Sequence, residues 1–323
     1  MAHKRSSKSH AGGGRRFFGI VFLLIGAVIL VANEIRTFKT QVTLNAAASW
    51  VEMENPDVLD PSLEGKLIHA TDTVTTPDIL SDPDFELSCN AIILHRKVQY
   101  YQLVETCHHY NEDGDSYNEY SYDRSWQDKP INSKEFYETA LRNKNFTLMT
   151  FDDWKAYAYE VKFGAYKLPA ELYYQMEKNT GDKRLRLVPV SSLKPEVLQR
   201  LNEETCRAIG AQGDFVCIDD GRIFLGVDPQ NPQIGDVRIW YEGFLPGVCS
   251  VMAQVQDGGL TVFQPKGGKS FGEFSQGDHP AEDFLTYRSK DNIALAWGLR
   301  VIALIHLLVG GLMYRKGREM GKE

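Results

Sequence analysis

Two long apolar segments, one near each end of the chain, constrain its fold more than any other feature. Residues 17–32 (FFGIVFLLIGAVILVA) form an unbroken apolar run, and residues 293–314 (IALAWGLRVIALIHLLVGGLMY) form a second run that includes Arg300 and His306. A 16-residue helix is about 24 Å long at 1.5 Å per residue, a little under the ~30 Å hydrocarbon core of a bilayer. The two runs therefore predict transmembrane helices over residues 17–33 and 293–314.

The first run has an alternative interpretation as a cleaved signal peptide, because a basic segment precedes it. The only A-x-A-like site, at residues 46–48 (AAA), lies about 14 residues beyond the run, which is far for a signal peptidase site. An uncleaved membrane anchor is therefore the prediction.

Charge is distributed unevenly along the chain. The basic tails, residues 1–16 and 315–323, carry +5 and +2, and residues 34–292 carry −15, in a chain whose formal net charge is −7. The positive-inside rule predicts that both tails are cytoplasmic, which places residues 34–292 on the opposite, periplasmic or lumenal side. An acidic body also argues against nucleic acid as a partner, because phosphate binding needs a basic surface.

The sequence predicts the α+β class, with one β-rich extramembrane domain between two transmembrane α-helices. Residues 91–109 and 117–126 flank an Asp-Gly turn and predict a long hairpin. Residues 165–205 are interpreted as a helical insertion. Further strands are predicted at residues 66–74, 155–163, 213–218, 222–227, 237–241, 247–255 and 260–264, and helices at 169–178, 194–205 and 280–291.

Five residues in the predicted spans are candidates for a role in the membrane or in assembly: Gly19, Gly26, Trp297, Arg300 and His306. The two glycines are seven residues apart on one helical face, where small residues allow close helix approach. Trp297 suits an interfacial aromatic belt. Arg300 is costly in lipid, so it either snorkels outward or faces a partner helix or a lipid headgroup, and His306 is predicted to pack within the bundle.

The cysteines and histidines of the central domain predict no metal site, no cofactor and no catalytic centre. Cys107, His108 and His109 fall on a predicted strand, where adjacent side chains point to opposite faces, so they do not converge on one ion. One or two disulfides remain possible in an oxidising compartment. No C-x-x-C pair occurs among the five cysteines, Cys89, Cys107, Cys206, Cys217 and Cys249.

One short motif resembles a nucleotide-binding signature. Residues 267–270 (GGKS) look like the end of a phosphate-binding loop, but that motif requires glycine where this chain has Phe263. A polar loop is therefore the prediction at this position.

A series of short segments, spread in order over both spans and the central domain, is typical of one family. It comprises residues 33–36 (NEIR), 39–40 (KT), 64–69 (EGKLIH), 80–83 (LSDP), 96–98 (RKV), 101–106 (YQLVET), 120–122 (YSY), 126 (W), 131–136 (INSKEF), 234–238 (IGDVR), 277–279 (GDH) and 292–300 (NIALAWGLR). On these segments the chain resembles the transmembrane protein 43 (LUMA) family.

The resemblance implies a large lumenal or periplasmic domain between the first two spans, and no catalytic residues. Animal members of that family lie in the endoplasmic reticulum and inner nuclear membrane, self-associate, and contribute to nuclear envelope organisation with lamin- and emerin-type partners. They continue into further spans, whereas this sequence ends nine residues after Tyr314. A two-span form suits a bacterial member in the inner membrane, and a eukaryotic one would lie in the endoplasmic reticulum or inner nuclear membrane.

These features together predict an integral membrane scaffold rather than an enzyme. Its expected partners are membrane lipid, further copies of itself and other membrane proteins. The alternative is an envelope enzyme or a ligand-binding sensor that uses a pocket in residues 34–292.

Overall fold

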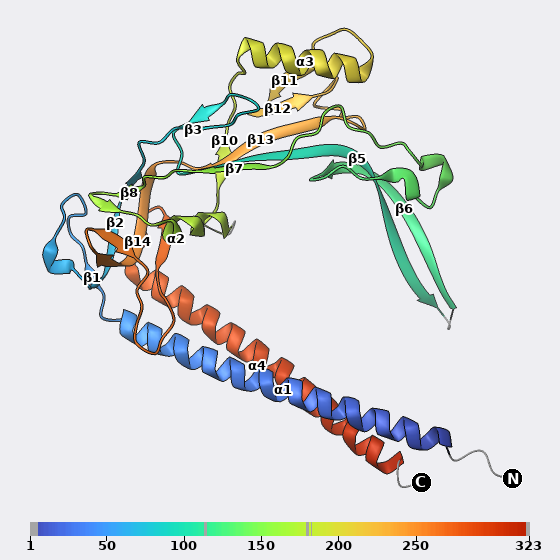
Figure 1. The fold of residues 1–323 in the computed structure, drawn as a ribbon, viewed down its shortest axis with the longest axis vertical. Coiled ribbons are helices and arrows are strands. Elements are labelled where there is room, and N and C mark those ends of the chain that lie inside the picture. The colour runs from blue at the N-terminus through green and yellow to red at the C-terminus, as the bar shows by residue number, and fades with distance from the viewer. Residues whose placement is uncertain (1–5, 113–114, 179–180, 182, 321–323) are drawn as a thin grey trace. The chain divides into compact units, whose positions relative to one another are not determined.

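The computed structural model describes residues 6–112, 115–178, 181 and 183–320, except for the side chains of residues 6–12, 112 and 115. The chain divides into two compact units (Figure 1). The first unit comprises residues 1–72, 165–173 and 248–323, and the second comprises residues 73–164 and 174–247.

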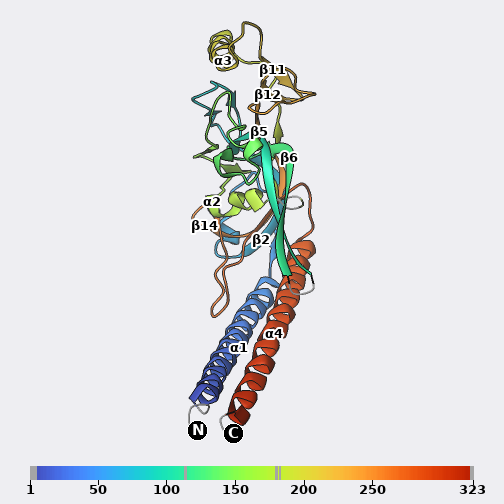
Figure 2. The same cartoon turned by 90° about the vertical axis from the view of Figure 1, so that its right-hand side faces the viewer.

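Two long helices dominate the first unit. Helix α1 (Ser6–Ala47) and helix α4 (Ala281–Met320) lie side by side and antiparallel, as Figures 1 and 2 show. Both are long and apolar enough to cross a membrane. Each helix continues well past its apolar run, because neither residues 33–47 nor residues 281–297 contain a glycine or proline that would end it. The helix predicted separately at residues 280–291 is therefore the beginning of α4.

A small sheet completes the first unit. Strand β14 pairs antiparallel with β15 and β16, and β15 pairs with β9. Strand β1 runs parallel to β2. Between these strands and the helices lies a core of Ala47, Leu67, Met252, Phe271, Ala281 and Phe284. The elements are β1 (Val51–Glu52), β2 (Leu67–Thr75), β9 (Tyr166–Lys167), α2 (Ala170–Tyr173), β14 (Gly247–Gln256), β15 (Gly259–Thr261) and β16 (Glu273–Gln276).

The second unit is built on the antiparallel sheet β11-β12-β13-β5-β6, in which β10 also pairs with β13 and β7 with β5. Helix α3 begins at Pro195 and ends at Ile209, and the residue that follows it is Gly210, whose φ of 77° suits a residue without a side chain. The elements are β3 (Leu80–Ser81), β4 (Ser88–Cys89), β5 (Ile93–Glu112), β6 (Asp115–Gln127), β7 (Trp154–Tyr157), β8 (Lys162–Phe163), β10 (Arg186–Val188), α3 (Pro195–Ile209), β11 (Val216–Asp219), β12 (Arg222–Leu225) and β13 (Val237–Phe244).

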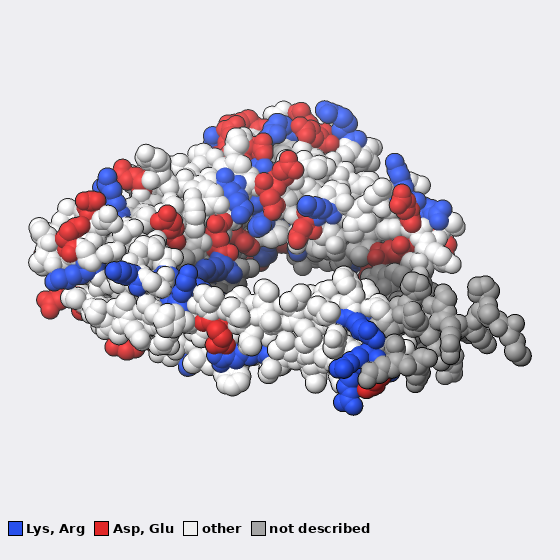
Figure 3. Space-filling view, turned by 60° about the horizontal axis from the view of Figure 1, so that its bottom comes forward, with Lys and Arg blue, Asp and Glu red and all other residues white. Residues whose placement is uncertain are grey.

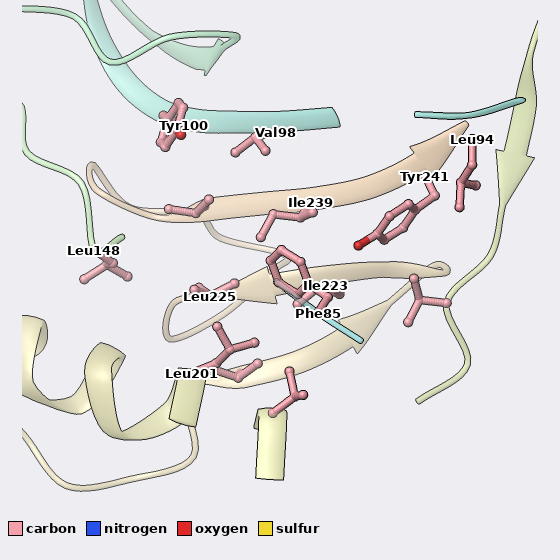
Figure 4. Close-up of a cluster of buried hydrophobic side chains, with 14 of the residues drawn as sticks. Phe85, Leu94, Val98, Tyr100, Leu148, Leu201, Ile223, Leu225, Ile239 and Tyr241 are labelled. Carbon is pink, nitrogen blue, oxygen red and sulfur yellow. The ribbon is translucent and has the colours of Figure 1, made fainter. Parts of the chain in front are cut away.

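Apolar side chains from these strands and from α3 form the core of the second unit, part of which Figure 4 draws. A buried ion pair lies beside this core. Arg96 Nη1 is 2.7 Å from Asp82 Oδ1, and the Tyr241 hydroxyl donates to Asp82 Oδ2 over 2.7 Å. The sequence segments 80–83 and 96–98, which carried part of the family resemblance, therefore meet in this network.

The predicted fold class is confirmed, as are the hairpin and most strand positions. The predicted strand 155–163 is wrong in one respect, because it divides into β7 and β8. Between them the chain turns outward, and the backbone N–H groups of Tyr159 and Glu160 donate to Asp78 Oδ2. The helical insertion proposed for residues 165–205 is also wrong, because that segment includes β9 and β10 and divides between the units. Residues 1–5 and 321–323 of the tails, and the turn at 113–114, lie outside the described residues.

Candidate functional site

Glycines bring the two long helices into close contact. A Cβ atom added to Gly19 would lie 2.9 Å from the Gly310 carbonyl oxygen, and one added to Gly26 would lie 2.9 Å from the Ala303 carbonyl oxygen. Real Cβ atoms essentially never come within 3.0 Å of another heavy atom, so larger residues here would push the helices apart. Gly19 and Gly26 therefore contact α4 of the same chain, and their role in assembly between chains stays a prediction.

Polar side chains link the helices where the apolar runs end. Asn33 Nδ2 donates to the Ala296 carbonyl oxygen over 3.0 Å, and Arg36 Nη1 donates to Asn292 Oδ1 over 2.9 Å. Both asparagines are buried. Buried amides that are paired in this way fix the register of one helix against the other, because any shift would leave them unpaired.

Arg300 faces the other helix of its own chain. Its guanidinium donates two hydrogen bonds to the Glu34 carboxylate, over 2.7 and 2.9 Å, and lies 5.2 Å from the centre of the Trp297 ring. The paired geometry satisfies a charge that would otherwise be costly near lipid. The structure thus shows a contact with the other helix of the same chain, and a role of Arg300 and Trp297 in the membrane or in assembly stays a prediction.

His306 lies deeper in the pair. Its ring is stacked 5.5 Å from that of Phe22, and its Nδ1 donates to the Ile302 carbonyl oxygen over 2.8 Å. At the far end, Arg16 Nε donates to the Gly317 carbonyl oxygen over 2.9 Å, where a cation also complements the negative end of the α4 dipole. Contacts between the helices thus extend along most of their length.

A second candidate surface is the outer part of the β5–β6 hairpin, residues 104–112 and 115–123, which we call the outer ribbon. Strand β13 pairs with β5 only from Ile93 to Tyr100, whereas β6 pairs with it as far as Glu112. Among the described residues, the outer ribbon therefore has two strands and no third. An exposed strand of this length presents unpaired backbone groups to which another chain can bind.

The direction of the free backbone groups on β6 follows from a neighbouring contact. The Leu103 N–H donates to Asn145 Oδ1 over 2.8 Å, and Asn145 Nδ2 donates to the Leu103 carbonyl oxygen over 2.9 Å, so the Leu103 backbone points away from β6. Arg124, its partner in the register, then also points its backbone groups away from β5. By alternation, the even-numbered residues 116–124 direct their N–H groups to the free edge.

The other titratable candidates do not converge on a reaction centre. His69 contacts Glu52 and the His279 carbonyl oxygen, His95 lies 2.9 Å from Glu177, and His109 contacts Asn118. All five cysteines are free thiols. Within the described ranges, no three His, Cys, Asp or Glu side chains are grouped as a metal site would require.

This architecture defines an integral membrane protein that is anchored by two helices and carries a β-rich domain between them. The chain belongs to the transmembrane protein 43 family, whose sequence profile matches residues 100–317. It is 28% identical to Transmembrane protein 43 of Homo sapiens and of Mus musculus over 319 residues, covering 94% of this chain and 73% of each relative. The Transmembrane protein 43 homolog of Drosophila melanogaster is 23% identical, covering 91% of this chain and 74% of its own. No solved structure matches.

These relatives bear no enzymatic name. They are animal proteins, so the prediction of a bacterial member draws no support from them. The cytoplasmic position of both tails likewise stays a prediction.

The sequence interpretation missed Glu34, Asn33 and Asn292. A signal for them was present, because two antiparallel spans place the residues just after the first apolar run level with those at the beginning of the second. Glu34 is the first acidic residue of the chain, and that position made it the natural partner for Arg300.

Proposed function

We propose that this protein is an integral membrane scaffold, which self-associates through the outer ribbon and thereby organises other proteins of its membrane. The observation that carries this proposal is the free edge of β6, with a second copy of the chain as its occupant. Two-stranded ribbons are marginally stable in water, and a third strand adds both hydrogen bonds and cross-strand contacts.

The side chains of the outer ribbon also suit binding. Tyr110 and Tyr117 stack with ring centres 5.4 Å apart, and both are more than a third exposed. Exposed tyrosines are enriched at interfaces, because they supply large contact areas at low cost in conformational entropy. A membrane scaffold also needs an anchor in the bilayer. Helices α1 and α4 contact each other within one chain, so this anchor does not depend on a partner.

The first experiment uses oxidative cross-linking of the full-length protein in the membranes in which it is expressed. Asn118 lies near the middle of the β6 part of the outer ribbon, so antiparallel pairing of two copies would bring the two Asn118 residues close together. In a background with Cys107→Ser and Cys217→Ser, which removes both exposed native thiols, Asn118→Cys should give a dimer, whereas Gln199→Cys on the exposed face of α3 should not. Equal dimer from both variants would mean random collision, and would contradict the proposal.

A matched pair of substitutions tests the edge itself. In the Asn118→Cys background that reports the dimer, Ser116→Pro removes an N–H group that points to the free edge, whereas Ser116→Ala retains this group and loses the same hydroxyl. We expect the proline variant to reduce the cross-linked dimer fraction several-fold and the alanine variant to leave it nearly unchanged. A proline variant that still forms dimers would exclude β6 as the interface.

A further inference from the structure

A basic cavity lies beside the two helices, where they leave their apolar runs. It has a volume of about 250 Å³, and three cationic side chains, Arg36, Lys269 and Arg288, line it together with a single acidic residue, Asp291. It can therefore admit a phosphate-sized group but not a complete two-chain lipid.

The positive charge in this cavity is only partly compensated. Arg36 donates to neutral oxygens of Asn33 and Asn292, and its Nε is buried with no hydrogen-bond partner. Arg288 approaches the buried Glu273 at 3.6 Å. Among the described residues, no carboxylate lies within ion-pair distance of Arg36 or Lys269. Desolvation, with Arg36, Arg288 and Lys39 nearby, lowers the pKa of Lys269, as expected where cations gather without a counterion.

Lys269 is held at the cavity by a tight backbone contact. Its N–H donates to Thr43 Oγ1 over 2.7 Å, and the same hydroxyl donates to the Lys269 carbonyl oxygen over 3.0 Å. A Cβ atom on the preceding residue, Gly268, would lie 2.7 Å from Thr43 Oγ1, so glycine is required for the loop to come this close to α1. The GGKS segment is thus a loop that fixes a lysine at the helices, rather than part of a nucleotide-binding motif.

The depth of the cavity matches a lipid headgroup. Arg36 lies four residues after the first apolar run, which is about 6 Å along the helix, and Leu295 lies just inside the second run. Headgroup layers occupy roughly 5–8 Å on each side of the hydrocarbon core. In Figure 3, the helices show a largely white, uncharged stretch with blue Lys and Arg side chains towards both of its ends.

We propose that this cavity binds the phosphate of an anionic membrane lipid, with Arg36, Lys269 and Arg288 around the phosphate and the acyl chains outside along the helices. Hydroxyl groups of Thr40 and Ser270 lie in the same wall and add polar contacts. The net positive lining disfavours a zwitterionic headgroup, whose choline or ethanolamine cation would have to lie nearby. This proposal is independent of the outer ribbon.

The test is lipid binding by the full-length protein in bilayer nanodiscs of phosphatidylcholine with or without 10% phosphatidic acid, followed by native mass spectrometry of the retained lipids. We expect Lys269→Gln to reduce phosphatidic acid retention about fivefold, the loss typical for one basic residue near an anionic lipid surface. The Thr43 contacts are retained in this variant, because they use the Lys269 backbone. Lys266→Gln, an exposed lysine of the same loop that does not line the cavity, should change retention less than twofold.

The phosphate group in the cavity could come from a lipid headgroup or from free phosphate, and a competition experiment with inorganic phosphate distinguishes the two. Inorganic phosphate should not displace the lipid at millimolar concentration, and it should not raise the unfolding temperature of the lipid-free protein as much as phosphatidic acid does. If Lys266→Gln and Lys269→Gln lose phosphatidic acid equally, general surface charge rather than the cavity explains its retention, and the proposal is overturned. The opposite result would be that inorganic phosphate alone raises the unfolding temperature and that Lys269→Gln abolishes this rise. The cavity would then bind free phosphate, and the proposal that it binds a lipid would be overturned.

Discussion

The helix pair and the second unit solve the same packing problem by different means. The second unit surrounds the ion pair of Arg96 and Asp82 with large apolar side chains in water, where the hydrophobic effect is the main driving force. The helix pair has lipid around it, so apolar burial gives little, and close contacts at glycines with paired polar groups hold it instead. The comparison teaches that replacing a paired arginine with leucine should be costly in the second unit, where the pair is buried, and far less costly in the helix pair, where it is partly exposed.

The largest effect is expected in the second unit, for Arg96→Leu. This change leaves the carboxylate of Asp82 buried without its cation, which typically costs about 3–5 kcal/mol. Urea unfolding in detergent, followed by tryptophan fluorescence, can measure it, since Trp126, Trp154 and Trp240 lie in this unit. The matched control is Lys194→Gln, which breaks the exposed pair with Glu86 and should lower the free energy of unfolding far less than Arg96→Leu does. Equal effects of both variants would contradict the distinction between buried and exposed pairs.

The next effect is expected in the helix pair, for Gly310→Leu. A Cβ at Gly310 would lie 2.8 Å from the Gly19 carbonyl oxygen, so the helices must separate, at a typical cost of about 1–3 kcal/mol. A Cβ at Gly311 would meet nothing within 4 Å, so Gly311→Leu is the matched control and should be nearly neutral. Thermal unfolding of the two variants in bilayers separates them. An equal response would mean that the helices do not touch at Gly310.

A pH-dependent effect is expected from Asp236. Burial raises the pKa of its carboxyl to about 6, above the ~3.9 of an unfolded chain, so the folded state retains a proton that the unfolded state has lost between about pH 4 and 6. Stability should therefore fall as pH rises through that window and then level off. Asp236→Asn should remove the fall and gain up to about 2 kcal/mol at pH 7, after allowance for solvent screening. Parallel pH profiles for both proteins would exclude the effect.

The smallest effect on stability is expected for Arg300→Leu. The pair with Glu34 is partly exposed, so its loss should lower the free energy of unfolding far less than the loss of the buried Arg96 pair and leave the domain folded. The oligomer distribution in bilayers is the more informative measurement, with Trp297→Leu as a second variant that removes only the stacked ring. If Arg300→Leu leaves the oligomer distribution unchanged, Arg300 has no role in assembly beyond its contact with Glu34.

The sequence was enough to predict what depends on local patterns. The apolar runs predicted the two long helices, the Asp-Gly turn predicted the β5–β6 hairpin, and the helix predicted over residues 194–205 corresponds to α3. The division of the domain was not predictable, because residues 165–173 join strands that are distant in sequence. The basic cavity was missed for a similar reason, since Arg36, Lys269 and Arg288 meet only when the loop that contains Gly268 lies against α1.

The most direct test of the account is the sidedness of the central domain relative to the tails. Two native thiols, Cys107 and Cys217, are exposed in that domain, and Lys316→Cys in an otherwise cysteine-free chain provides a reporter in the C-terminal tail. A membrane-impermeant maleimide is applied to sealed vesicles of one orientation and then to permeabilised ones. The account predicts that the domain thiols and the tail reporter are labelled from opposite sides. Labelling of both from the same side would contradict a domain held between two membrane-spanning helices.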